Sequence, residues 1–222
     1  MINSLIALLA PLGTFGVQAS KIPQLSPEPG VIPGYEVVPL VWEMETSPGG
    51  PTVYLNGTVE EVYSQLLEIN PQYETLYGTI EQNAEKNIKA RSEQQQQEQL
   101  NIESREYRDW TDCTINNWEW ASMVRIEQGI RYLQGVSGRP TLGPGPARCS
   151  RVSCSYDSAI YWCNDNTHEF SLNTFRDIAN GAQVIINDCT PYRGPQYPDS
   201  IFIRGQRFHG NLWNAIVRYD PC

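Results

Sequence analysis

The stretch GPGPARCSRVSCSYDSAIYWCND, residues 143–165, places three cysteines in a run rich in serine, tyrosine and tryptophan. Polar and apolar residues alternate on both sides of a central Asp-Ser pair. This pattern predicts two short strands joined by a turn. Tyr156, Tyr161 and Trp162 would then pack within the sheet, although an aromatic platform for a ligand is the alternative. The stretch therefore indicates a hairpin at the centre of the fold.

The cysteines favour disulfides over a metal or redox site. They are spaced C-x4-C-x8-C in this stretch, and the only histidines of the chain are His168 and His209. Structural zinc sites need closely spaced cysteine pairs or nearby histidines, and redox sites need C-x-x-C, which the chain lacks. An even number of cysteines in an oxidising compartment is typical of a disulfide framework. We expect no metal and no cofactor, and disulfides whose pairing the sequence leaves open, at Cys113, Cys149, Cys154, Cys163, Cys189 and Cys222.

The N-terminus indicates secretion. An apolar run from Leu5 to Val17 ends in Val17-Gln18-Ala19, which fits the small-x-small pattern of signal peptidase sites. The run is shorter than the roughly 20 apolar residues that span a bilayer. Lys and Arg are missing before it, so a buried N-terminal strand or helix is the alternative. We expect a signal peptide over residues 1–19 and a secreted, extracellular protein.

The charge of the chain limits its partners. The 222 residues carry a formal net charge of −9, with a pI of about 4.7. A nucleic-acid surface needs a basic face, and anionic membranes attract basic segments. We therefore expect no nucleic-acid partner and no simple electrostatic binding to membranes.

Helices and further strands surround the predicted hairpin. Apolar residues recur at helical spacing in residues 117–135 and 171–189. Two more strands are predicted over 200–208 and 212–222. This α-β-β-α-β-β order favours an α+β fold, a small antiparallel sheet with helices packed on one face. We assign residues 110–222 to this disulfide-stabilised C-terminal domain.

The N-terminal part reads as a smaller unit. Two β-prone runs flank a Pro-Gly turn, and Thr58 with Glu61 forms a capping box for a helix. Residues 20–78 are therefore predicted as a ββα module or pro-segment. Asn56 begins an Asn-Gly-Thr sequon, so we expect it to accept a glycan. Residues 79–109 are polar and Gln-rich; they suit a solvated helix but cannot bury a core, and are predicted as a linker.

Several segments carry a family resemblance. The runs IEQGIRYLQGVSGRPTLGPGPARCSRVSCSYDSAIYWCNDN (126–166) and FRDIANGAQVIINDC (175–189), with the ending RGQRF…LWNAIVRYDPC, resemble small secreted cysteine-rich proteins of filamentous fungi. That group is similar in layout to the necrosis-inducing effector family and, more distantly, to fungal killer toxins with an α/β sandwich. The resemblance covers Asp112 to Cys222. It implies a fungal source, secretion, disulfides and non-catalytic binding to a protein, cell-wall or membrane target outside the producing cell.

One group of residues offers an enzymatic alternative. Asp165, His168, Glu169 and His209 contain the carboxylates and imidazoles that a small secreted hydrolase or nuclease uses for acid–base cleavage. Both histidines lie in polar or turn-like segments, however, which favours surface loops. Phosphate-loop, dinucleotide and HExxH motifs are missing from the sequence. We therefore expect a binding protein with no catalytic residues, and keep the hydrolase as the second hypothesis.

Overall fold

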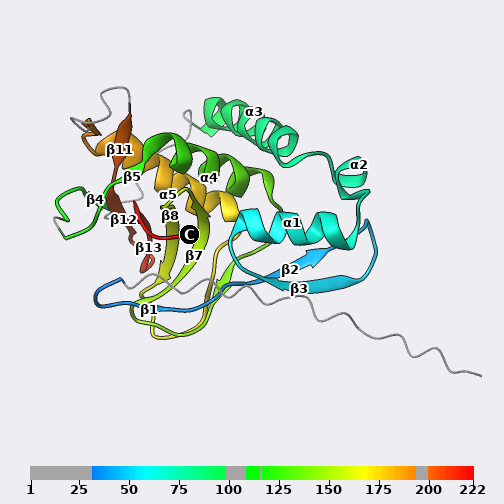
Figure 1. Cartoon of the computed structure of the whole chain (residues 1–222), viewed down its shortest axis with the longest axis horizontal. Coiled ribbons are helices and arrows are strands. Elements are labelled where there is room, and N and C mark those ends of the chain that lie inside the picture. Colours follow the sequence, from blue (N-terminus) through cyan, green and yellow to red (C-terminus); the bar gives the residue numbers. More distant parts are fainter. Residues whose placement is uncertain (1–31, 99–108, 116, 194–199) are drawn as a thin grey trace, which may run out of the picture.

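The computed structural model describes residues 32–98, 109–115, 117–193 and 200–222 (Figure 1). The predicted signal peptide, residues 1–19, lies outside these ranges. Among the residues that the structure describes, no helix combines the length and apolar character needed to span a membrane.

A six-stranded sheet forms the centre of the molecule. Its strand order is β1-β7-β8-β13-β12-β4, and all neighbouring pairs are antiparallel except β1 with β7. The predicted α+β class with a largely antiparallel sheet is thus confirmed. The strands are β1 (Glu36–Val37), β4 (Trp110–Asp112), β7 (Arg148–Ser155), β8 (Ser158–Asn164), β12 (Gly205–His209) and β13 (Trp213–Tyr219).

The predicted hairpin is formed by β7 and β8. Tyr156 and Asp157 make its turn, with φ angles of 47° and 55°. Tyr161 and Trp162 are fully buried, whereas Tyr156 is 74% exposed. The core interpretation of the aromatic residues is therefore confirmed for the two residues of β8 and wrong for Tyr156.

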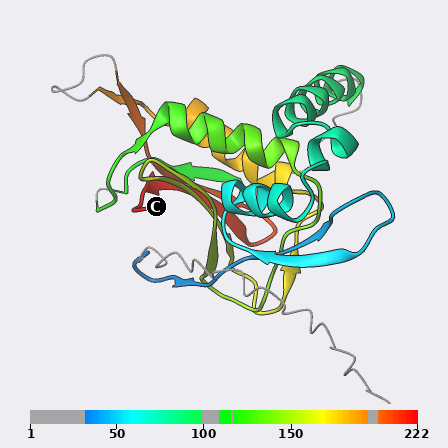
Figure 2. The same ribbon diagram turned by 45° about the vertical axis from the view of Figure 1, so that its right-hand side comes forward.

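Two helices cover one face of this sheet (Figures 1 and 2). They are α4 (Met123–Gly135) and α5 (Phe175–Asp188). Helix α5 begins with a capping box in which the Thr174 hydroxyl accepts from Arg176 N and Asp177 accepts from Thr174 N. The apolar stripes that predicted both helices face the sheet. Their fully buried members include Ile126, Leu133, Ile178, Ala182 and Ile185.

The N-terminal hairpin and helix pack onto the same core. Strands β2 (Val41–Glu45) and β3 (Thr52–Asn56) precede α1 (Val59–Ile69), which has the predicted capping box. Trp42 of β2 and Phe175 of α5 belong to one continuous cluster of buried residues. The ββα arrangement predicted within residues 20–78 is present, but it shares its hydrophobic core with the C-terminal part.

The segment predicted as a linker contains a packed helix. After a short helix, α2 (Tyr73–Tyr77), the chain forms α3 (Ile80–Glu98). Gly135 allows close contact between α3 and α4, because a Cβ there would lie 2.1 Å from the carbonyl oxygen of Ile80. Asn87 Nδ2 also donates to Gln134 O at 2.8 Å. Over residues 80–98 the linker interpretation is therefore replaced by a helix that joins the fold through its first turns.

Short strands complete the structure. β5 (Ala121–Ser122), β10 (Tyr192–Arg193) and β11 (Ile201–Ile203) form a three-stranded sheet, while β6 (Thr141–Leu142) pairs with β9 (Phe170–Ser171). The single strand predicted over 200–208 is wrong, because the chain passes from β11 to β12 of a different sheet at Arg204. The guanidinium of Arg204 lies 4.3 Å from the centre of the Trp120 ring.

Three disulfides pair all six cysteines. Cys113–Cys189 joins the end of β4 to the end of α5, Cys149–Cys163 links β7 to β8, and Cys154–Cys222 holds the C-terminus. The expectation of a disulfide framework is confirmed. The first and third bridges tie the end of α5 and the C-terminus to the sheet, and the second links two neighbouring strands within it.

Candidate functional site

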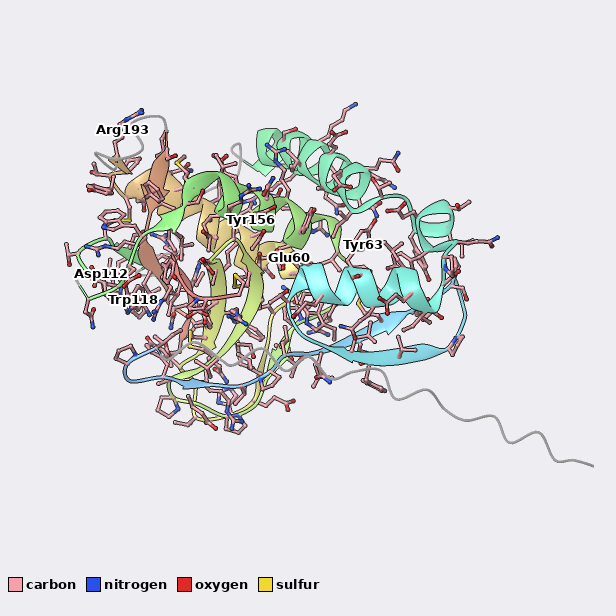
Figure 3. The ribbon with its side chains drawn as sticks, viewed as in Figure 1. Glu60, Tyr63, Asp112, Trp118, Tyr156 and Arg193 are labelled. Atoms are coloured by element: carbon pink, nitrogen blue, oxygen red, sulfur yellow. A yellow bond between two sulfur atoms is a disulfide. The ribbon has the colours of Figure 1, made fainter. Side chains whose placement is uncertain are left out.

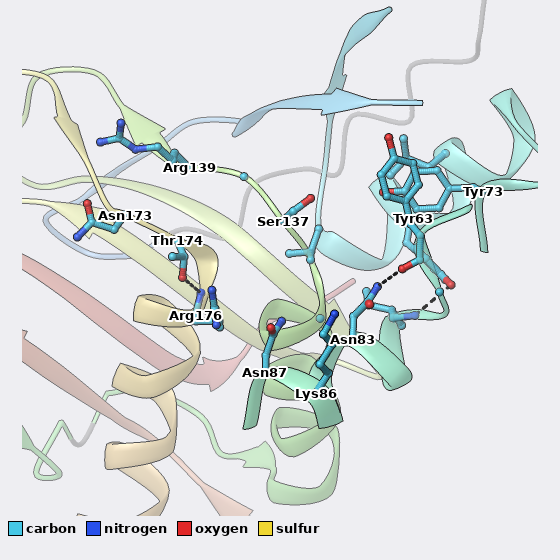
Figure 4. A pocket seen from close by; sticks show the side chains of 17 residues that line it. Tyr63, Tyr73, Asn83, Lys86, Asn87, Ser137, Arg139, Asn173, Thr174 and Arg176 are labelled. Carbon is cyan, nitrogen blue, oxygen red and sulfur yellow. Dashed lines mark hydrogen bonds between the residues drawn. The ribbon is translucent and has the colours of Figure 1, made fainter. Parts of the chain in front are cut away.

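A cavity of about 450 Å³ lies between α1, α2, α3, the loop after α4 and the start of α5 (Figure 4). Its walls come from the segment predicted as a ββα module, from α3 and from the C-terminal part of the chain. The lining residues are Tyr63, Leu66, Tyr73, Tyr77, Gly78, Ile80, Asn83, Lys86, Asn87, Gly135, Val136, Ser137, Gly138, Arg139, Asn173, Thr174 and Arg176.

The cavity concentrates positive charge on an acidic protein. Lys86 comes from α3, Arg139 from the loop after α4, and Arg176 from the first turn of α5. The described residues of the lining include no Asp, Glu, His or Cys. Within the described part of the chain, none of the three cationic groups has a hydrogen bond or ion pair to another side chain. Their charges are therefore available to a ligand.

The other end of the cavity is aromatic. The Tyr63 and Tyr73 rings lie edge to face with centroids 6.4 Å apart, and Tyr77 lies 4.7 Å from Tyr73. Tyr63 Oη donates to Glu74 Oε1 at 2.5 Å and accepts from Ile80 N. Burial raises the pKa of Tyr73 to about 12, so its hydroxyl stays protonated and can donate at neutral pH.

The amides between the two ends are fixed. Asn83 Nδ2 donates to Tyr77 O at 3.0 Å, and Asn87 Nδ2 donates to Gln134 O at 2.8 Å. These bonds hold α3 at a set distance from α2 and α4. In Figure 4, the side chains of Lys86, Asn87 and Arg176 point into the space below Ser137. Tyr63 and Tyr73 lie at the opposite end. The arrangement places cations and hydrogen-bond donors around one space.

The candidate catalytic residues lie in different surroundings. His209, at the end of β12, stacks on Trp213 with a centroid distance of 3.7 Å and lies 3.2 Å from an Asp109 carboxylate oxygen. Burial lowers the pKa of His209, although Asp109 opposes this shift. His168 and Glu169 are exposed. The turn predicted at His209 is present, because Leu212 N donates to His209 O. The imidazole, however, is half-buried near Gly181 of α5 rather than in a surface loop.

Asp165 belongs to a separate polar network. Its Oδ2 accepts from Asn214 Nδ2 at 2.7 Å, and Asn214 Oδ1 accepts from Gln206. Burial raises the pKa of Asp165, while the bond from Asn214 lowers it. Among the described residues, no hydrogen bond or ion pair links the side chains of Asp165, His168, Glu169 and His209.

Glu60 is a partly buried carboxylate that the sequence did not single out (Figure 3). It lies in the first turn of α1, where its Oε1 accepts from Ser153 Oγ at 2.6 Å and its Oε2 from Cys154 N at 3.2 Å. Gly129 of α4 gives Ser153 room for this bond, since a Cβ there would lie 2.3 Å from Ser153 Oγ. Burial raises the pKa of Glu60. With both oxygens occupied, Glu60 fastens α1 to β7.

The predicted glycosylation site is accessible. Asn56 is exposed at the end of β3. The next residue, Gly57, has a φ of 121°, and its carbonyl accepts from Trp42 Nε1 at 2.8 Å. Attachment of a glycan at Asn56 stays a prediction.

Comparison with known proteins identifies no relative. No protein-family model matches the chain, and neither the curated proteins nor the solved structures contain a match. Within the described ranges, no group of three or more His, Cys, Asp or Glu side chains is placed to hold a metal ion.

Proposed function

We propose that the protein is secreted and acts outside the producing cell by binding a target, as fungal effectors and killer toxins do, without catalysis. The observation that carries this proposal is the chemistry of the cavity. Cationic groups, amides and tyrosines line it, and the described part of the chain contributes no carboxylate, imidazole or thiol to its lining. Such groups donate hydrogen bonds and attract anions, whereas hydrolysis needs a group that titrates near the working pH.

The charge distribution supports binding of an anionic target. The chain as a whole carries −9, so anions are repelled from most of its surface. Lys86, Arg139 and Arg176 provide a local exception. Arg176 is half-buried, so water and salt screen its charge less than the charges of Lys86 and Arg139, which are exposed.

The disulfides suit this role outside the cell. The Cys113–Cys189 bridge holds the C-terminal end of α5, and the N-terminal end of the same helix provides Arg176 to the cavity. Disulfides persist in oxidising, extracellular compartments. The three bridges therefore favour secretion and a site whose walls stay in place.

The acid–base hypothesis has less support from geometry. A general acid or base must come within about 2.6–3.2 Å of its proton partner. His168 is exposed, and His209 is stacked against Trp213 and paired with Asp109. These surroundings fit a surface role for His168 and a packing role for His209.

The proposal is tested with purified secreted protein in plant-tissue infiltration and microbial growth-inhibition assays. We compare the wild type with His168→Ala and His209→Phe, the second of which keeps a ring against Trp213. Both variants should keep full activity, because neither imidazole lies in the cavity. A His168→Ala protein that is folded by circular dichroism but inactive would favour the hydrolase instead.

A further inference from the structure

The cavity has two chemically different ends. Tyr63, Tyr73 and Tyr77 gather at one end with Leu66 and Ile80. At the cationic end, Lys86 and Arg176 lie on the far side of Asn83 from the tyrosines, whereas the Arg139 side chain points away from both of them at the edge of the cavity (Figure 4). A ligand that fills the whole cavity must therefore combine a flat apolar part with an anionic part.

We propose that this cavity binds a small phosphate monoester whose organic part is a flat ring. This inference rests on the proposed binding function and names the ligand class of the same site. The volume of about 450 Å³ lies within the roughly 300–1,000 Å³ of small-molecule sites.

The number and type of cations favour phosphate over a carboxylate. A phosphate monoester carries a charge of about −1.5 to −2 near pH 7 and has three acceptor oxygens. Lys86 and Arg176 carry two positive charges, which balance a phosphate monoester, and the guanidinium of Arg176 has paired donors that match phosphate oxygens. A carboxylate has one charge and two oxygens, so it would leave one of these two positive charges unbalanced.

The start of α5 contributes a side chain rather than its helix dipole. The partial positive charge of this helix N-terminus already faces the Asp177 carboxylate, which accepts from Thr174 N. The Thr174 hydroxyl accepts from Arg176 N, and Arg176 lines the cavity with its side chain.

The tyrosine end favours a ring. Aromatic side chains attract flat rings through offset or edge-to-face contacts. The Tyr63 hydroxyl is already bonded to Glu74 and Ile80, which fixes its ring. The tyrosine end would thus contact the ring of the ligand, and the cationic end would hold its phosphate.

The test is calorimetric titration of the full-length secreted protein with phenyl phosphate, inorganic phosphate, benzoate and benzyl alcohol. Phenyl phosphate should bind at least about tenfold more tightly than the other three, since inorganic phosphate lacks the ring, benzyl alcohol lacks the anion, and benzoate carries a carboxylate in place of the phosphate. Equal binding of benzoate would overturn the choice of phosphate, and equal binding of inorganic phosphate would overturn the ring. No measurable binding of phenyl phosphate at millimolar concentration would overturn the inference as a whole.

Charge reversal locates the site. Lys86→Glu and Arg176→Glu should each weaken phenyl phosphate binding at least about tenfold, as loss of a charge-assisted bond to phosphate requires. Lys89→Glu is the matched control, because it makes the same change on an exposed face of α3 outside the cavity. If charge reversal perturbs folding, Arg176→Gln removes the positive charge without adding a negative one and is titrated in its place. Equal loss in the Lys89 variant, or none in the cavity variants, would contradict the site.

The same samples separate this inference from the proposed function. Release of phenol and phosphate during the titration would show catalysis and refute the proposed function while leaving the site intact. Activity in the tissue or growth assay without phenyl phosphate binding would refute the ligand class and leave the binding function standing.

Discussion

The indole of Trp42 lies parallel to the ring of Phe175, with centroids 4.0 Å apart and planes 4° from parallel. Trp42 comes from the N-terminal hairpin and Phe175 from the first turn of α5. Both side chains are almost completely buried, and they connect the ββα arrangement to the layer that covers the main sheet. The shared core favours one folding unit over the division into modules that the sequence suggested.

Trp42→Ala should destabilise the whole molecule, because it removes this stack and the bond from Trp42 Nε1 to Gly57 O. Large aromatic-to-alanine changes in cores cost about 3–5 kcal/mol. Denaturant unfolding followed by circular dichroism measures this cost. Val41→Ala, at a neighbouring position that is 55% exposed, should change the unfolding free energy by no more than about 0.5 kcal/mol. A Trp42 variant as stable as the Val41 variant would show that the hairpin folds separately.

Removing the disulfides one at a time should rank them by the loops they close. Cys113–Cys189 and Cys154–Cys222 span 76 and 68 residues, whereas Cys149–Cys163 spans 14. The chain-entropy model gives losses of about 4.5 kcal/mol for the two long loops and about 3 kcal/mol for the short one. Paired Cys→Ala variants and chemical denaturation measure these losses. The largest loss from the Cys149–Cys163 pair would contradict loop entropy as the main contribution.

Asp220→Ala should be strongly destabilising. Asp220 Oδ2 accepts from Arg151 Nη1 and from Tyr161 Oη, each at 2.7 Å, and the side chains of the ion pair are 5% and 1% exposed. Removal of one partner from a buried pair costs about 3–5 kcal/mol, because the other charge stays buried and uncompensated.

The control for Asp220 is an exposed ion pair of the same type. Glu36 pairs with Arg148 at 3.1 Å, and its side chain is 64% exposed. Glu36→Ala should cost no more than about 1 kcal/mol, as is usual for surface pairs. Equal losses in thermal and chemical unfolding for the two variants would contradict a special role for the buried pair.

Glu60→Gln should become more stabilising as the pH rises. Burial raises the pKa of Glu60 in the folded state, so the folded protein binds this proton more tightly than the unfolded chain. The wild type therefore loses unfolding free energy as the pH rises from the ordinary pKa of a glutamate through the raised value. The glutamine side chain of the variant keeps an oxygen for Ser153 but does not titrate. Chemical unfolding of both proteins across this pH range measures how the difference in their unfolding free energies changes. A difference that stays constant with pH would contradict the prediction.

The sequence predicts the parts of the fold that have strong local patterns. The β7–β8 hairpin follows from alternation around a turn, and α5 from an apolar stripe that begins at Phe175. The packing of α3 was not predicted, because this helix joins the core mainly through Ile80 and Ala84 at its start. The break at Arg204 was missed because the residues on both sides are equally β-prone, and only tertiary packing assigns them to different sheets.

The candidate site has no local signal at all. Lys86, Arg139 and Arg176 are far apart in the chain and stand among unlike neighbours. They line one cavity because Gly135 and Asn87 fasten α3 to α4, while the loop that follows α4 leads past the start of α5. By contrast, the sequence grouped Asp165, His168 and Glu169 because they are adjacent, and the structure gives them separate surroundings.

The central claim is that the protein acts by binding through its cationic cavity, and the most direct test is the activity of the double variant Lys86→Glu/Arg176→Glu. Its control is Lys89→Glu/Arg131→Glu, which makes the same total charge change on exposed sites outside the cavity. Both proteins are compared with the wild type in the tissue-infiltration and growth-inhibition assays, after circular dichroism has shown that they are folded. The account predicts that activity is lost in the cavity variant and kept in the control. A folded cavity variant with wild-type activity would contradict it.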